Sequence, residues 1–89
     1  MKASELLANI RDLAVLLHRG NAKQAETILE EITGSLNAVM VAEGNGEDGV
    51  HRAQQTMFAI DEVRILMTQG DFHSAATAAR DAAREWGHP

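Results

Sequence analysis

Few side chains in this sequence are placed where they could do chemistry. His18, Asp71 and His73 stand beside two short junctions between helical segments. In an up-down arrangement both junctions lie at one end of the molecule, so these three side chains could meet there as zinc ligands. Solvated turn residues are the more ordinary interpretation. We therefore predict neither a metal nor a cofactor, and these three residues remain the only candidates for metal ligands.

Motifs for catalysis are absent from the sequence. It has no glycine-rich phosphate loop opening a helix, no His-Glu-x-x-His and no Gly-x-Ser-x-Gly. It also has no cysteine, which excludes disulfides and thiolate metal sites and fits a reducing compartment. The sequence thus predicts a protein without catalytic residues, which is not an enzyme, and we expect it in the cytoplasm.

Acidic side chains concentrate in the second helical segment and in the glycine-rich segment that follows it. These residues are Glu26, Glu30, Glu31, Glu43, Glu47 and Asp48. The net charge is −5, and the basic residues are scattered singly except for Arg80 and Arg84, which share a helical face. Because nucleic-acid-binding proteins usually neutralise phosphates with a basic face, we expect no direct contact with nucleic acid. The acidic surface suits a basic protein, although charge runs are usually only solvated.

The third helical segment carries two large apolar side chains on its polar side. At about 100° per residue, Phe58 and Ile65 point together and nearly opposite to Ile60. A helix in a small bundle needs one buried stripe, so a second stripe predicts a contact surface. Val15 has the matching position in the first segment. The expected interface residues are Phe58, Ile65, Gln54, Asp61, Glu62 and Val15. They predict a homodimer or, for a monomer, a different protein partner.

Helical periodicity dominates the sequence, and no segment alternates at the period of a β-strand. We predict helices over residues 4–19, 22–42, 49–69 and 72–86. Their expected N-caps are Ser4, Asn21, Asp48 and Asp71. Gln24 is placed as the capping-box partner of Asn21. Gly20 and Gly70 should end the first and third helices with positive φ. Gly34 weakens the second helix and allows a kink.

Each predicted helix has one stripe of buried residues. The stripes are Leu6, Ile10, Leu13 and Leu17; Ala25, Ile28, Leu29, Ile32, Leu36, Val39 and Met40; Ala53, Met57, Ile60, Val63 and Met67; and Phe72, Ala75, Ala79, Ala82, Ala83 and Trp86. The alanines let the last helix approach its neighbours closely, and Trp86 should be largely buried near the end of the chain. A shift of fifty residues aligns the two halves, placing Ile10 on Ile60 and Gly20 on Gly70.

These patterns predict one all-α domain over residues 1–89. It comprises a first helical hairpin at about 4–42, an acidic glycine-rich loop at 43–49 and a second, similar hairpin at about 50–86. We expect the two antiparallel hairpins to pack as a four-helix, up-down-up-down bundle. The alternative is a repeat-like stack of the hairpins.

The two junctions between helices read Gly20-Asn21-Ala22-Lys23-Gln24-Ala25 and Gly70-Asp71-Phe72-His73-Ser74-Ala75. Both, and the second more closely, resemble the junction between the two helices of a tetratricopeptide repeat. The resemblance is confined to about fifteen residues in each half. It implies tight helical hairpins and a protein-binding role.

Together these observations predict a non-catalytic protein–protein interaction module, a small acidic adaptor or regulator that works by occupying a partner's surface. No apolar run approaches the roughly 18–20 residues of a membrane span, so we expect no contact with a membrane. Two alternatives stay open. The alanines of the last helix could leave a cavity for a small apolar ligand between the hairpins, or a metal at the turns could mark an accessory subunit of an enzyme.

Overall fold

Four α-helices make up the part of the chain that the computed structural model describes, which is residues 3–41 and 46–87, with the backbone alone at residue 3 and at 46–49. The helices are α1 (Ala3–His18), α2 (Ala22–Val41), α3 (Gly46–Thr68) and α4 (Phe72–Gly87). No strand occurs within these residues. None of these helices is both long and apolar enough to cross a membrane. The expected all-α class is confirmed.

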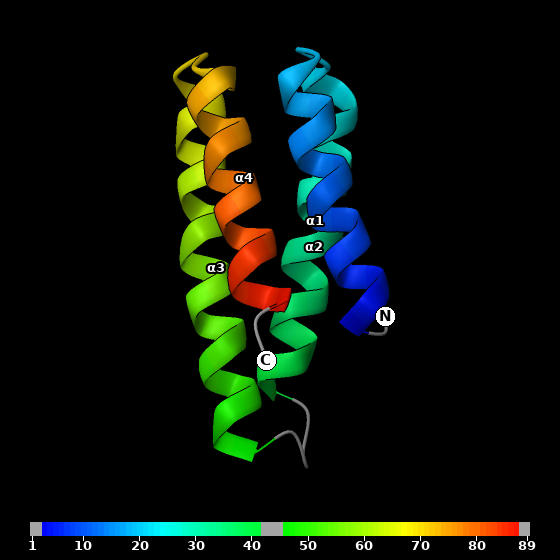
Figure 1. Cartoon of the computed structure of the whole chain (residues 1–89), viewed down its shortest axis with the longest axis vertical. Helices are drawn as coiled ribbons and strands as arrows, with labels where there is room; N and C mark the ends of the chain where they lie inside the picture. Colours follow the sequence, from blue (N-terminus) through cyan, green and yellow to red (C-terminus); the bar gives the residue numbers. More distant parts are fainter. Residues whose placement is uncertain (1–2, 42–45, 88–89) are drawn as a thin grey trace.

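The helices form a ring in which each helix packs against two others. α1 contacts α2 and α4, and α3 also contacts α2 and α4. In the described parts of the chain the diagonal pairs, α1 with α3 and α2 with α4, are farther apart, with no Cα atoms within 8 Å of one another. Figure 1 shows the chain direction alternating from helix to helix, with both tight turns at the same end. The two hairpins therefore lie side by side as the predicted four-helix bundle.

Gly20 and Gly70 end α1 and α3 with φ angles of 75° and 78°, as predicted. The Gly20 N–H donates to the Leu17 carbonyl at 3.0 Å, and the Asn21 N–H donates to the Leu16 carbonyl at 2.9 Å. The turn between α3 and α4 repeats both bonds fifty residues later, at the same lengths. This pair of bonds is the Schellman motif, which requires a left-handed residue where each glycine stands. Two residues of positive φ thus fix both hairpins.

The N-caps of α2 and α4 follow directly on these glycines. Asn21 Oδ1 accepts from the Gln24 N–H at 3.4 Å, and Asn21 Nδ2 donates to Gln24 Oε1 at 2.8 Å. In the usual capping box the glutamine would bind the backbone N–H of the cap residue. Here that N–H is already used in the turn, so Gln24 binds the asparagine side chain instead. Asp71 Oδ1 accepts from the Ser74 N–H at 3.1 Å.

Two of the predicted N-caps are wrong. α1 begins one residue and α3 three residues earlier than predicted, so Ser4 and Asp48 lie inside helices. The predicted loop at 43–49 is shorter for the same reason. The first turn of α3 contains Gly46 and Gly49. A glycine costs only about 1 kcal/mol in a helix interior, and the contacts of the long packed segment that follows offset this cost. The same balance applies at Gly34, where α2 continues without interruption.

The predicted stripes form the core of the bundle. Their buried members are Leu6, Ile10, Leu13, Leu17, Ala25, Leu29, Ile32, Leu36, Ala53, Ile60, Val63, Ala75, Ala79, Ala82 and Trp86. The others are half-buried: Ile28, Val39, Met40, Met57, Met67, Phe72 and Ala83. Among the described side chains, four more are buried that were not predicted to be, namely Ala14, Thr56, Ala76 and Ala78. The Thr56 hydroxyl donates to the Arg52 carbonyl at 2.9 Å, so this buried polar group is satisfied within its own helix.

Small residues bring α4 close to its neighbours. Three of its alanines, at 75, 79 and 82, are fully buried, and Trp86 retains only 7% exposure, as predicted. At the end of the helix, a Cβ added to Gly87 would lie 3.4 Å from both methyl carbons of Leu7. α4 and α1 therefore pack against each other, which brings together the two helices that are farthest apart in the sequence.

Candidate functional site

The outer face of α3 exposes the two apolar side chains that the sequence singled out. Phe58 is 69% exposed and Ile65 is 57% exposed, whereas Ile60 on the opposite side of the helix is fully buried. Polar residues at Gln54, Asp61 and Glu62 are also exposed. These five exposed residues, Gln54, Phe58, Asp61, Glu62 and Ile65, are called the α3 outer stripe below. Their predicted exposure is confirmed.

Val15 is exposed as well, at 48%, but it does not join this stripe. It lies on α1, which is diagonal to α3 in the ring and does not pack beside it. The outward faces of the two helices therefore point to different sides of the bundle. The sequence offset relates Val15 to Ile65 correctly, but equivalent positions in two hairpins do not form one surface.

The predicted acidic surface is only partly within the described residues. Glu26, Glu30 and Glu31 are exposed on α2. Glu43 lies outside the described residues, and so do the side chains of Glu47 and Asp48, whose backbone belongs to α3. The part that the structure does place is a row of carboxylates on the outside of α2.

The three candidate metal ligands have other roles at the turn end of the bundle. The Ser74 backbone N–H and hydroxyl hold the pKa of Asp71 below its ordinary value of 3.8, and nearby His73 adds to the effect. Asp71 is thus engaged as the cap of α4. His18 instead borders a groove between α1 and α4. In the described ranges no group of three or more histidines, cysteines and carboxylates is arranged to hold a metal.

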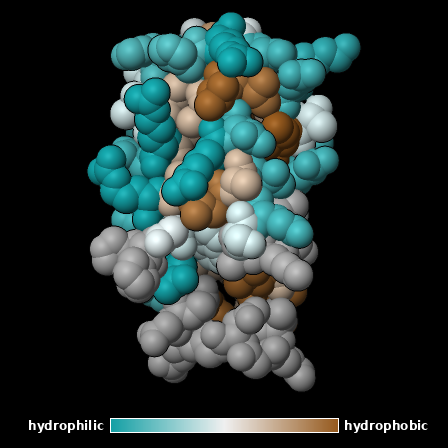
Figure 2. Space-filling view, turned by 45° about the vertical axis from the view of Figure 1, so that its right-hand side comes forward, coloured by the Kyte–Doolittle hydropathy of each residue, from teal (hydrophilic) through white to brown (hydrophobic). Residues whose placement is uncertain are grey.

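That groove is the feature that sequence reasoning missed. It has a volume of about 600 Å³, and it is lined by Arg11, Ala14, Val15, His18, Arg19, Arg80, Ala83 and Arg84. Four of the eight lysines and arginines in the chain therefore surround one depression, which is called the α1/α4 groove below. With α1 turned to the front, Figure 2 shows hydrophilic side chains around patches of apolar surface. The groove thus has alanine and valine side chains at its base and arginine side chains on both sides.

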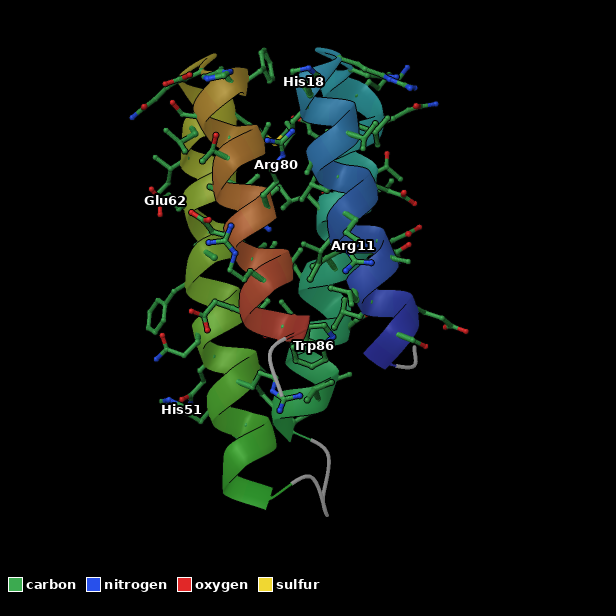
Figure 3. The ribbon with its side chains drawn as sticks, viewed as in Figure 1. Arg11, His18, His51, Glu62, Arg80 and Trp86 are labelled. Carbon is green, nitrogen blue, oxygen red and sulfur yellow. The ribbon has the colours of Figure 1, made fainter. Side chains whose placement is uncertain are left out.

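The arginines of the groove are exposed and available. Over residues 3–41 and 46–87, none of the four forms an ion pair with a carboxylate within 4.0 Å. Figure 3 shows Arg80 directed from α4 toward α1, with Arg11 and His18 on α1. The arginines of this lining suit an anionic ligand, and its alanine and valine side chains add apolar surface.

The groove could not be recognised in the sequence because its two sides, α1 and α4, come from opposite ends of the chain. The one local signal was Arg80 with Arg84, four residues apart on a helix and so on one face. Arg11 and Arg19 look isolated until α1 is known to lie beside α4. The groove forms only when α4 packs against α1 in the tertiary structure.

The chain was also compared with known proteins. No family model matches it, and neither the comparison with curated proteins nor that with solved structures found a similar protein.

Proposed function

We propose that this chain is a non-catalytic protein–protein interaction module, a small adaptor or regulator that self-associates through the α3 outer stripe. The observation that carries the proposal is the exposure of Phe58 and Ile65 opposite the buried Ile60. Large apolar side chains that are exposed together and bordered by polar groups are the usual anatomy of a protein contact. An aromatic side chain at the centre is the usual anchor of such a contact.

A two-fold axis through Phe58 gives a simple arrangement for the dimer. A two-fold contact uses the same surface on both copies, so one self-complementary stripe is enough. With the axis perpendicular to α3, the two copies of the helix run antiparallel, and Glu62 of one copy faces Gln54 of the other. The amide of Gln54 can then donate to the carboxylate, so the polar border is satisfied when the apolar centre closes.

The expected dimer is weak and reversible. A stable interface usually contains roughly 20–30 residues on each side, whereas this stripe offers two large apolar anchors and a narrow border. Association should therefore depend strongly on protein concentration, as suits an adaptor that exchanges partners.

Sedimentation equilibrium over a range of concentrations tests the proposal. Phe58→Glu should shift the protein to monomer while circular dichroism shows unchanged helicity. Val41→Glu is the matched control, because it places the same charge at an exposed apolar position on α2, outside both the α3 outer stripe and the α1/α4 groove. Association of Phe58→Glu equal to that of the wild type would contradict the assigned surface. A wild type that stays monomeric would rule out self-association and leave the stripe to a different protein.

A further inference from the structure

The α1/α4 groove plays no part in the contact proposed for α3, and its charge needs a separate explanation. Its four arginines stand in a chain whose net charge is −5. The two hairpins provide an internal comparison, because a shift of fifty residues carries α1 onto α3 and α4 onto α2. The groove between α1 and α4 therefore has a structural counterpart on the other side of the bundle, between α3 and α2.

A hydrogen bond between α3 and α2 supports this structural correspondence between the two sides. Arg64 Nη2 donates to Thr33 Oγ1 at 2.9 Å, across the boundary between α3 and α2. The shift carries these positions onto Ala14 and Ala83, which both line the α1/α4 groove. The same pairs of positions thus face one another in both helix pairs.

The charges differ between the two sides. Arg11 of the groove corresponds to Asp61, and Arg80 corresponds to Glu30, so two arginines on one side are carboxylates on the other. All four side chains are exposed. Since similar backbone packing accepts either sign at these positions, packing alone does not require a positive groove. The presence of arginine at these positions is better explained by a ligand that binds to the positive charge.

The layout of the groove limits what that ligand can be. On α1 the positive side chains extend from Arg11 to Arg19, a rise of about 12 Å, and on α4 Arg80 and Arg84 are about 6 Å apart. The charges therefore lie in rows, with about one helical turn between Arg80 and Arg84 and about two turns between Arg11 and Arg19, and they do not converge on one point. Ala14, Val15 and Ala83 provide a small apolar floor between the rows.

We propose that the α1/α4 groove binds an acidic amphipathic helix of a partner protein. Carboxylates at positions i, i+4 and i+8 of a helix form a row in which neighbours are spaced like Arg80 and Arg84, and the two ends are spaced like Arg11 and Arg19. Small apolar side chains beside that row would pack on the alanine floor, in the helix-in-groove mode of recognition. Arginine suits carboxylates because its planar guanidinium can donate two parallel hydrogen bonds.

The same observations disfavour other anions. The arginines are exposed, so the groove has no desolvated cradle of the kind that holds a single phosphate. Among the described residues no phenylalanine, tyrosine or tryptophan lines the groove, whereas stacking on such rings supports the binding of single-stranded nucleic acid. A long polyanion would also be repelled by a protein with a net charge of −5. A short acidic helix can stay within the groove.

A titration with designed peptides tests this proposal. The probe is an amphipathic helical peptide of about 18 residues with glutamates in one row and alanines and leucines beside it. Its matched control has glutamine at every glutamate position. In a nuclear magnetic resonance titration, the glutamate peptide should shift the amide signals of Ala14, Val15 and Ala83. The glutamine peptide should bind at least about tenfold more weakly, and added salt should weaken only the glutamate peptide.

Charge reversal then tests the residues. Arg11→Glu combined with Arg80→Glu should weaken the glutamate peptide by about tenfold or more and create binding for a lysine version of the peptide. Lys23→Glu combined with Arg52→Glu is the matched control, since it makes the same change in net charge at exposed residues outside the groove. Unchanged circular dichroism spectra would show that both variants fold.

Several results would overturn the proposal. One is an equal loss of peptide binding in both double variants, and another is a set of signal shifts that excludes the groove. Tighter binding of a short DNA duplex or of polyphosphate would assign the groove to a different class of ligand. Loss of self-association in the Arg11→Glu, Arg80→Glu variant would make a second copy the occupant. Self-association lost only in Phe58→Glu, with peptide binding retained, would show the two surfaces to be independent, as we propose.

Discussion

Alanine at Gly70 and alanine at Gly34 should change the stability of this protein in opposite directions. Gly70→Ala should lower the free energy of unfolding by about 1 kcal/mol, and Gly34→Ala should raise it by about 0.5–1 kcal/mol. The chemical change is the same at both sites. The backbone conformation of the glycine is what differs.

The surroundings and backbone conformation of the two glycines determine these changes in the free energy of unfolding. A Cβ built on either glycine meets no other heavy atom within 4 Å, so steric clash with neighbours does not contribute. Gly70 has a φ of 78°, and an L-residue in that conformation costs about 1–2 kcal/mol. Lower entropy of the unfolded chain offsets about 0.4–1 kcal/mol of this cost. Gly34 lies inside α2, where alanine gains helix propensity without any conformational cost.

Urea denaturation followed by circular dichroism measures the effect, with fluorescence of Trp86 as an independent probe of the same transition. For a domain of this size, 1 kcal/mol corresponds to a shift of about 4–8 °C in Tm. Gly20→Ala should reproduce the loss, because its φ is 75° and its surroundings are equally open. Gly70→Asn should lose less, since asparagine tolerates the left-handed conformation. If Gly70→Ala proved as stable as Gly34→Ala, the assignment of a left-handed turn would be refuted.

Two further predictions concern Trp86 and Asp71. Trp86→Ala should cost about 3–5 kcal/mol because it empties a buried site, enough to unfold a marginal domain, and native Trp86 should emit at shorter wavelength than a solvated tryptophan. Fully solvated emission would contradict its burial. The pKa of Asp71 is lowered in the folded state, so the stability that its charge provides is complete above its ordinary pKa of 3.8 and is lost as the pH falls through the folded value. Asp71→Asn should remove this part of acid denaturation and Asn21→Asp should add one at the other turn, as urea denaturation at several pH values would show. Equal acid sensitivity in all three proteins would contradict the role of the cap.

Local patterns explain why much of the fold could be predicted. Gly20 and Gly70 act through the conformation of a single residue, and the apolar stripes follow from the helical period alone. The exposure of Phe58 and Ile65 was predictable for the same reason, because it depends only on which side of α3 faces the core. The helix starts were less predictable. The cost of a glycine in the first turn of α3 is small and is decided against contacts made by the rest of the helix.

The groove could not be predicted from local patterns, because its prediction requires knowing which helices pack side by side. Arg80 lies beside Arg84 in the helical projection, but no local pattern joins either of them to Arg11. Thr56 was missed for a related reason. A threonine is not an expected core residue, yet its hydroxyl bonds to a carbonyl in its own helix and so can be buried at little cost.

The ring of four helices has a consequence for how the molecule opens. Each hairpin is closed by a short turn with two reinforcing hydrogen bonds, so contacts within a hairpin span few residues and form at low entropic cost. Contacts between α1 and α4 instead join residues 3–18 to residues 72–87, the largest sequence separation between any two packed helices. Partial unfolding should therefore separate the hairpins along this boundary while each remains helical. Amides in the Schellman turns would then exchange with solvent later than those near Gly87, and the groove would be lost before either hairpin melts.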